Sequence, residues 1–168
     1  MLSSTSIESE IQELIENDII LTIGSKECAD IVNKLSKKAD KKIRAHIKID
    51  TGFGRYGFIY SDIRTIVETI NSLKDVSIEG MYSHFSLAYY KNNKWTIKQF
   101  NRFMEVVEAL KLNDINIQTL HICNSPAFLN YPNMHLNGAR IGSAFLGRVD
   151  ADINVGLKKI GKLKCSIE

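Results

Sequence analysis

The chain has 168 residues, 44% hydrophobic and 24% charged, which suits one domain of ordinary size with its own apolar core. Its formal charge of +3 is spread along the chain, and this distribution argues against a nucleic-acid-binding surface. No run approaches about 18 apolar residues and the first residues are polar and acidic, so we expect a cytoplasmic chain without membrane contact. The three cysteines are far apart and form no C-x-x-C pair, which favours neither a disulfide framework nor a metal site.

Helical and strand-like patterns alternate along the chain. Helical spacing of apolar residues begins near Ser6 or Ser9, at Ser25, at Ser61 or Asp62, and near Trp95. Apolar runs predict strands over residues 19–23, 43–50, 76–85 and 115–122, and a last strand over 140–145. Between the last two, Ser125 is expected to cap a helix whose first residue is Pro126. This alternation predicts a parallel α/β sheet of five strands.

The central segment, residues 43–58, reads IRAHIKIDTGFGRYGF and combines a strand pattern with a glycine-rich turn. Apolar and polar residues alternate up to Asp50, so one face of the strand is expected to be buried. Three glycines then surround Arg55. A strand that ends in such a turn places its last polar side chains at the mouth of a sheet, where α/β folds keep their sites.

Three interpretations of this segment stand before any family is considered. Asp50, Thr51 and Gly52 spell the D-T-G of aspartic proteases, but that fold is all-β and this chain is rich in helical patterns. Gly52, Gly54 and Gly57 match the dinucleotide fingerprint G-x-G-x-x-G, although its third glycine belongs inside a helix. A glycine-rich loop that needs positive φ explains the same residues without a ligand.

The stretch HIKIDTGFGRYGF resembles the H-x-K-x-D-T-G-M-x-R-x-G segment of the alanine racemase family. Further matches follow in the same order: GMYSHF at residues 80–85, HICNS at 121–125 and ARIGS at 139–143. The family's enzymes use pyridoxal 5'-phosphate (PLP) in a (β/α)8 barrel. The resemblance implies a partial TIM barrel holding its fourth to eighth strands, because a whole barrel takes about 250 residues. Residues 1–150 would be an incomplete PLP-binding barrel domain, and residues 151–168 would begin a C-terminal β-domain whose first strand covers 162–167.

The resemblance also implies roles for individual residues that contact the cofactor ring. Arg140 would point at the pyridine nitrogen, and His121 would hydrogen-bond Arg140 and fix its orientation. His84 would lie against the ring, and Arg55 would hydrogen-bond the phenolic oxygen. Lys48 matches a lysine that is often carbamylated, which would let it hold Arg55; unmodified, it would extend out of the sheet mouth.

Four further positions resemble the residues that bind the cofactor phosphate: Asn124, Ser125, Gly142 and Ser143. Backbone N–H groups at a helix start and in a glycine turn are donors for an anion. A helix cap at Asn124-Ser125-Pro126 is the competing explanation for the first of these two segments.

The resemblance implies that neither catalytic base lies in this chain. The Schiff-base lysine belongs to the first barrel strand, and the second base is a tyrosine from the partner subunit of a homodimer. The parent protein would interconvert L- and D-alanine, or serine, for cell-wall precursors, and the chain alone is expected to be an inactive fragment. The alternatives are a non-catalytic PLP- or phosphate-binding module and a structural remnant without a ligand.

Overall fold

The structure is a computed structural model that describes residues 4–39, 41–149, 152 and 155–160. Its elements, in chain order, are α1 (Glu8–Glu16), β1 (Leu21–Ile23), α2 (Lys26–Ser36), β2 (Ile43–Asp50), β3 (Phe58–Ile59), α3 (Ile63–Ser72), β4 (Val76–Tyr82), α4 (Lys94–Leu112), β5 (Thr119–Cys123), α5 (Ser125–Asn130) and β6 (Gly138–Ala139). Two 3-10 turns cover Pro132–Met134 and Ser143–Leu146. The strand expected over residues 162–167 lies outside the described residues.

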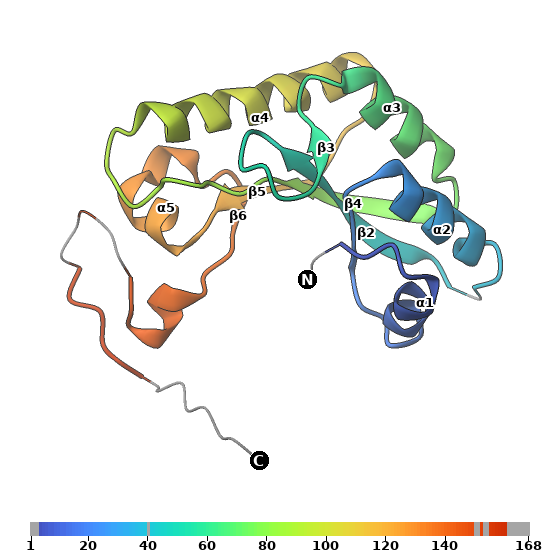
Figure 1. The fold of residues 1–168 in the computed structure, drawn as a ribbon, viewed down its shortest axis with the longest axis horizontal. Helices are drawn as coiled ribbons and strands as arrows, with labels where there is room; N and C mark the ends of the chain where they lie inside the picture. The colour runs from blue at the N-terminus through green and yellow to red at the C-terminus, as the bar shows by residue number, and fades with distance from the viewer. Residues whose placement is uncertain (1–3, 40, 150–151, 153–154, 161–168) are drawn as a thin grey trace.

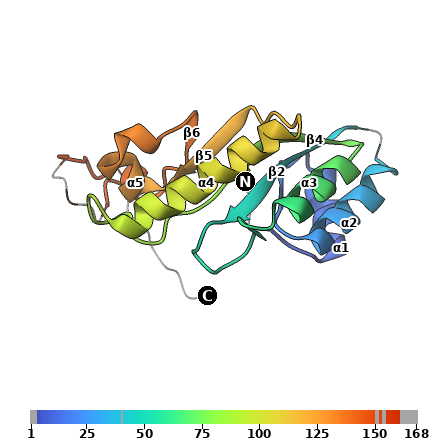
Figure 2. The ribbon, with the colours of Figure 1, turned by 90° about the horizontal axis from the view of Figure 1, so that it is seen from above.

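The strands form one sheet in the order β1-β2-β4-β5-β6, and every neighbouring pair is parallel. This confirms the predicted parallel α/β sheet and its path of five strands, to which the two-residue β3 adds a pairing with the end of β2. Figure 1 shows α2, α3 and α4 along one side of the sheet and α5 beside β5 and β6. Seen from above, the long α4 runs from the α5 side of the molecule towards α3 and β4 (Figure 2).

The core lies where the sheet packs against its helices, because the apolar positions of both are fully buried there. Strand residues Ile23, Ile47 and Ile122 are 0% exposed, as are Val32 of α2 and Phe103 of α4. Burial of such side chains contributes about 1.5–3 kcal/mol each. None of the helices within the described part of the chain is long and apolar enough to cross a membrane.

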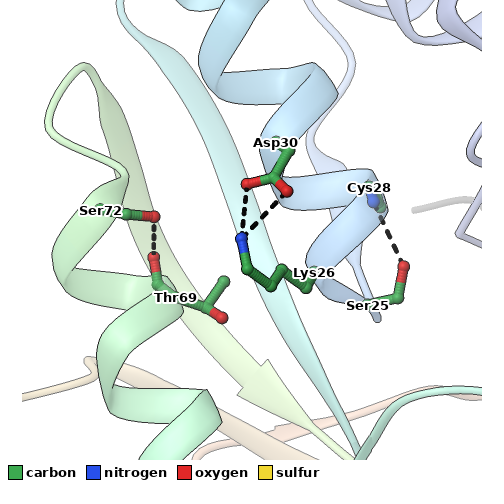
Figure 3. A network of polar contacts seen from close by, with 6 residues as sticks. All are labelled: Ser25, Lys26, Cys28, Asp30, Thr69 and Ser72. Carbon is green, nitrogen blue, oxygen red and sulfur yellow. Dashed lines mark hydrogen bonds and ion pairs between the residues drawn. The ribbon is translucent and has the colours of Figure 1, made fainter.

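Side chains that accept backbone N–H groups mark most helix starts. Ser25 caps α2 by accepting the N–H of Cys28, and Lys26 pairs with Asp30 one turn later (Figure 3). The first helix differs from the prediction, since neither Ser6 nor Ser9 caps α1. Its N-cap is Ile7, whose own N–H is accepted by the hydroxyl of Thr5.

Sequence-based strand limits were wrong at four places, the first being β1, which begins at Leu21 rather than at residue 19. Strand β4 ends at Tyr82 rather than at residue 85, and β5 begins only at Thr119. The last strand is not residues 140–145 but Gly138–Ala139, and the chain then turns into the 3-10 segment Ser143–Leu146. The turn has a physical cause, because the Ser125 hydroxyl accepts the N–H groups of Gly142 and Ala144 at 3.0 and 3.2 Å.

The start of α5 also differs from the prediction. Asn124, not Ser125, is its N-cap: the Asn124 side-chain oxygen accepts the N–H of Ala127 at 3.1 Å. Ser125 and Pro126 are the first two helical residues. The side-chain oxygen of Asn124 is therefore used in capping α5. The Ser125 hydroxyl instead connects α5 to the segment after β6.

Candidate functional site

Polar side chains from four strands meet where those strands end. They come from β2 and β5 themselves, from the segments that follow β4 and β6, and from the first residue of α5, and they are Lys48, His84, His121, Ser125 and Arg140. Because the strands are parallel, their carboxyl ends share one edge of the sheet. The four sequence motifs, which are up to 90 or so residues apart in the chain, therefore converge on one place.

Arg140 is at the centre of this group. Its Nη1 donates to His121 Nδ1 at 2.7 Å, and its Nη2 donates to His84 Nδ1 at 3.1 Å and to the Ser83 carbonyl at 2.6 Å. Its guanidinium lies over the ring of Tyr82, 5.0 Å from the centroid. Both Nη atoms are thus used, whereas the Nε–H finds no hydrogen-bond partner within the described part of the chain.

The two histidines that contact Arg140 are neutral at neutral pH. Burial, followed by the positive charge of Arg140, lowers the pKa of His121 to about 3 and that of His84 to about 4. Burial also lowers the pKa of Arg140, but a guanidinium keeps its charge in proteins. Each histidine therefore presents a lone pair to a permanent cation.

Lys48 is buried beneath the same edge, with 2% of its surface exposed. Its Nζ donates to the Ile49 carbonyl at 2.7 Å and lies 5.4 and 5.6 Å from the ring centroids of Tyr56 and Tyr82. Burial lowers the pKa of Lys48 to about 8. The expectation that an unmodified Lys48 extends out of the sheet mouth is wrong, because the side chain folds back among these aromatic rings.

The glycine-rich turn is built around the carboxylate of Asp50. That carboxylate accepts the backbone N–H groups of Gly52, Phe53 and Gly54 at 2.8–2.9 Å. Arg55 is exposed, and its guanidinium stacks 4.6 Å from the ring centroid of Phe53. Phe53 in turn meets the ring of His84 edge-on at 5.4 Å, so it links Arg55 to the site.

This geometry excludes the dinucleotide interpretation of the turn. Gly52, Gly54 and Gly57 all have positive φ, and Gly57 leads into the strand residue Phe58 rather than lying in a helix. The aspartic-protease interpretation fails as well, since the sheet is parallel and Asp50 spends its carboxylate on the turn. The expectation of a loop with positive φ is confirmed.

The segments that resemble phosphate-binding residues are in contact with each other. Ser125 is 3% exposed and its Oγ accepts the N–H of Gly142. The expectation that this N–H is a free donor for an anion is therefore wrong. Gly142 and Ser143 are exposed, at the mouth of the sheet beside Ser125. The Ser125 hydroxyl hydrogen and the N–H of Ser143 have no partner within the described residues, and both are donors for a ligand.

The site carries positive charge that no carboxylate of the described residues neutralises by direct contact. In the described part of the chain, Lys48, Arg55 and Arg140 take part in none of the ion pairs, all of which join partly or largely exposed side chains elsewhere. Uncompensated cations of this kind favour an anionic ligand. The arrangement can therefore hold an anion while donating one directed hydrogen bond from Arg140 Nε.

Sequence reasoning assigned no role to three residues that shape the site. His46 contacts His121, Tyr82 stacks on the His121 ring with centroids 5.0 Å apart, and the Ser83 carbonyl accepts from Arg140. Two signals were available, because His46 shares a strand face with Lys48 and the other two residues lie inside GMYSHF.

Comparison with known proteins connects this site to a family. Residues 1–149 match the family model for the N-terminal domain of alanine racemase. The chain is 36% identical over 148 residues to the alanine racemase of Methanococcus maripaludis, covering 87% of this chain and 39% of that protein. It is 34% identical over 165 residues to that of Clostridium novyi, covering 95% of this chain and 42% of that protein.

Solved structures give the same result. Alanine racemase of Clostridium difficile 630 in complex with cycloserine superposes with a TM-score of 0.83 at 31% identity, over 90% of this chain and 42% of that one. The Bacillus anthracis enzyme with bound L-Ala-P gives 0.77 at 28% identity, over 90% and 38%. The sheet is thus part of a (β/α)8 barrel domain, and the chain spans about two fifths of the length of the relatives it matches. The chain belongs to the alanine racemase family, and its residues 1–149 match the family's N-terminal domain.

Proposed function

We propose that this chain forms the cofactor-facing part of a PLP-dependent racemase that interconverts L- and D-alanine, or serine. The observation that carries the proposal is the state of Arg140, whose Nη atoms are held by two histidines and by carbonyl groups while its Nε–H stays available. Two similar alanine racemase structures, one in complex with cycloserine and one with bound L-Ala-P, support a small ligand for this part of the family fold.

The described residues fit PLP, which carries an anionic phosphate, a phenolic oxygen and a ring nitrogen that accepts a hydrogen bond. Arg55 and Arg140 supply cations without ion-pair partners in the described part of the chain. The Ser125 hydroxyl and the Ser143 N–H supply donors at the mouth of the sheet. The protein cations therefore match the ligand's negative charge, and the Ser125 and Ser143 donors match its hydrogen-bond acceptors.

Arg140 sets the protonation of the ring nitrogen. When bound, PLP supplies the electron sink that makes the α-proton of an amino acid removable. Arg140 would donate its Nε–H to that nitrogen without giving up the proton, and would thereby keep the nitrogen unprotonated. By leaving the ring without a proton, Arg140 would weaken this sink and so would favour return of the proton to the α-carbon over side reactions.

Other residues orient the ligand around this contact. His84 is neutral and is fixed between Arg140 and Phe53, so its ring offers an uncharged surface for stacking. The exposed guanidinium of Arg55 stacks on the Phe53 ring and is free to donate a hydrogen bond to the phenolic oxygen. Asn124 caps α5 and thereby places Ser125, whose hydroxyl faces Gly142, at the phosphate end.

The bases that move the α-proton are proposed to come from outside residues 1–168. The family resemblance assigns them to a cofactor-linked lysine on the first barrel strand and to a tyrosine of the partner subunit in a homodimer. Residues 1–168 alone are therefore expected to bind or orient but not to racemise. The complete reaction is proposed for a cytoplasmic protein that supplies both bases.

A chimera tests the proposed function. Residues 1–149 replace the matching barrel segment of a full-length alanine racemase, and racemisation of alanine and of serine is measured by chiral chromatography. We expect racemisation that Arg140→Ala reduces by at least about 100-fold, the scale of removing one catalytic electrostatic contact. The matched control is Arg148→Ala, an exposed arginine, which should leave the rate unchanged. A folded, dimeric chimera without racemisation of either amino acid would contradict the proposal.

A further inference from the structure

The hydrogen bonds of Arg140 continue beyond His121 to a third histidine. His121 Nε2 lies 3.0 Å from Nδ1 of His46, and the two ring centroids are 5.2 Å apart. Arg140, just after β6, His121 of β5 and His46 of β2 thus form a line that passes over β4, in which His121 uses one ring nitrogen for each neighbour. The described residues hold no group of three or more His, Cys, Asp or Glu side chains suited to a metal ion, so the histidines are not gathered as ligands.

The donor at one end of this line determines every proton in it. Arg140 can only donate, so His121 Nδ1 must be an acceptor and the single proton of the neutral ring must be on Nε2. That Nε2–H points at His46 Nδ1, which must therefore accept as well. The proton of a neutral His46 is then on its own Nε2. Any other distribution would place two protons, or two lone pairs, in one of the contacts.

The backbone is shaped to receive the His46 ring. The register between β2 and β4 shifts after Ala45, so that Gly80 rather than Glu79 lies opposite His46. A Cβ atom added at Gly80 would lie 2.5–2.7 Å from three atoms of the His46 ring. Any side chain at position 80 would therefore push the ring away from His121. The opposite side of the arrangement is fixed too, because the Tyr82 ring stacks on His121 at an interplanar angle of 6°.

We propose that His46 is a positioning residue that holds His121 as its Nε2–H tautomer and thereby keeps Nδ1 open as the acceptor for Arg140. No atom other than His46 Nδ1 accepts the His121 Nε2–H among the described residues. Without that acceptor, the Nδ1–H tautomer of His121 becomes accessible, and it would aim a proton at the guanidinium. Only the consequence for the cofactor rests on the proposed function; the tautomer itself does not.

Electrostatics agree with this assignment. Burial is the largest effect on the pKa of His46 and lowers it, although the carboxylate of Glu79 acts in the opposite direction. Burial lowers the pKa of His121 to about 3, and both Arg140 and His46 add to that effect. Two neutral rings beside one permanent cation are what the line of hydrogen bonds requires.

The direct test needs no cofactor. Nitrogen-15 NMR of the histidine rings in the 168-residue chain reads which nitrogen of each ring carries the proton, and a coupling across the hydrogen bond identifies its two nitrogens. We expect protonated Nε2 in both His121 and His46, with coupling between His121 Nε2 and His46 Nδ1. A proton on His121 Nδ1 or on His46 Nδ1 in the folded native chain would overturn the proposal.

Substitutions separate positioning from general support of the fold. His46→Phe keeps a ring of similar size but removes the acceptor, so His121 should show a mixture of tautomers. His46→Asn places an amide oxygen near the former Nδ1 and should restore the native signal. Gly80→Ala should also give a mixture of His121 tautomers although His46 is still present, because the added methyl group displaces the His46 ring. His135→Asn, a histidine outside this line, is the control and should leave the His121 signal unchanged.

The failure of this inference differs from the failure of the proposed function. If PLP binds, His46→Phe should weaken its binding about three- to tenfold, the range expected for one lost neutral hydrogen bond, and His46→Asn should not. If PLP does not bind but the tautomers are as stated, the proposed function fails and the inference stands. A native His121 tautomer in both folded His46→Phe and folded Gly80→Ala would overturn the inference whatever PLP does.

Discussion

Arg140 and His121 lie 2.7 Å apart, Nη1 to Nδ1, and this contact fixes the protonation of the histidine as well as the position of the arginine. Arg140 Nη1 donates in this contact, and His121 Nδ1 can accept only while the ring is neutral. The same contact therefore connects the stability of the fold at low pH with the orientation of the group proposed to contact the cofactor.

The first prediction concerns the stability of the folded chain at low pH. The pKa of His121 is about 3 in the folded chain, below the ordinary value of 6.5, so the unfolded chain binds more protons between these limits. The stability contributed by a neutral His121 is fully present above pH 6.5 and decreases as the pH falls, by up to about 1.4 kcal/mol per pH unit. Urea unfolding of the native chain and of His121→Gln from pH 7 to 4.5 should show their difference in stability shrinking as the pH falls. A constant difference would contradict the prediction.

The second prediction concerns Lys48, whose pKa of about 8 leaves a substantial fraction of neutral amine near neutral pH. Its nitrogen can attack carbon dioxide, forming an N–C bond and releasing one proton, and the resulting carbamate would attract Arg55. Native mass spectrometry in bicarbonate should show one added carbon dioxide, more at pH 8 than at pH 7. Lys48→Arg should abolish the adduct, whereas replacing the exposed Lys26 by Arg should not. A chain of unchanged mass under all these conditions would count against the modification.

The third prediction compares two glycines of the same turn. Gly57 has φ +124°, and a Cβ there would lie 2.9 Å from the Lys48 carbonyl oxygen and 3.0 Å from the Asp50 nitrogen. Gly54 has φ +74° with no atom within 4 Å of an added Cβ. Gly54→Ala should cost about 1 kcal/mol of unfolding free energy through its backbone angle alone, and Gly57→Ala about 2–3 kcal/mol. Equal losses in urea unfolding would show that the close contacts at Gly57 are relieved.

The fourth prediction concerns Ser125, which joins the end of β5 to the segment after β6. Ser125→Ala removes the acceptor of the Gly142 and Ala144 N–H groups, so we expect a loss of about 1–2 kcal/mol in urea unfolding. Ser143→Ala is the control, since Ser143 is exposed, and should stay within about 0.5 kcal/mol of the native chain. Two variants of equal stability would mean that the Ser125 contacts do not hold the turn.

Local pattern was enough to predict the layers of the fold. Period-2 alternation in residues 43–50 and helical spacing around Phe103 and Leu110 reflect burial of one face, which a sequence displays directly. The limits of the last strand were not predictable in this way. Residues 140–145 look strand-like, but the hydroxyl of Ser125 draws Gly142 and Ala144 into a turn, and that contact joins positions 17–19 residues apart.

Motifs placed most of the candidate site, because residues at the carboxyl ends of parallel strands share one edge. They did not reveal His46 as a partner of His121, since the two are 75 residues apart and meet only through a register shift opposite Gly80. The expected free N–H at Gly142 was also wrong for a tertiary reason, its acceptor being Ser125. The residues that gather at the sheet edge were predictable from the sequence. Their hydrogen-bond partners were not, because these depend on the sheet register and on tertiary contacts.

The central claim is that Arg140 and its neighbours form part of a PLP site. The most direct test is a PLP titration of the folded 168-residue chain, followed by absorbance and fluorescence, beside Arg140→Ala and the control Arg148→Ala. The account predicts saturable binding that Arg140→Ala weakens by about 10-fold or more, the scale of one lost charge-assisted hydrogen bond, and that Arg148→Ala leaves unchanged. Absence of binding by the folded native chain, or equal binding by all three, would contradict it.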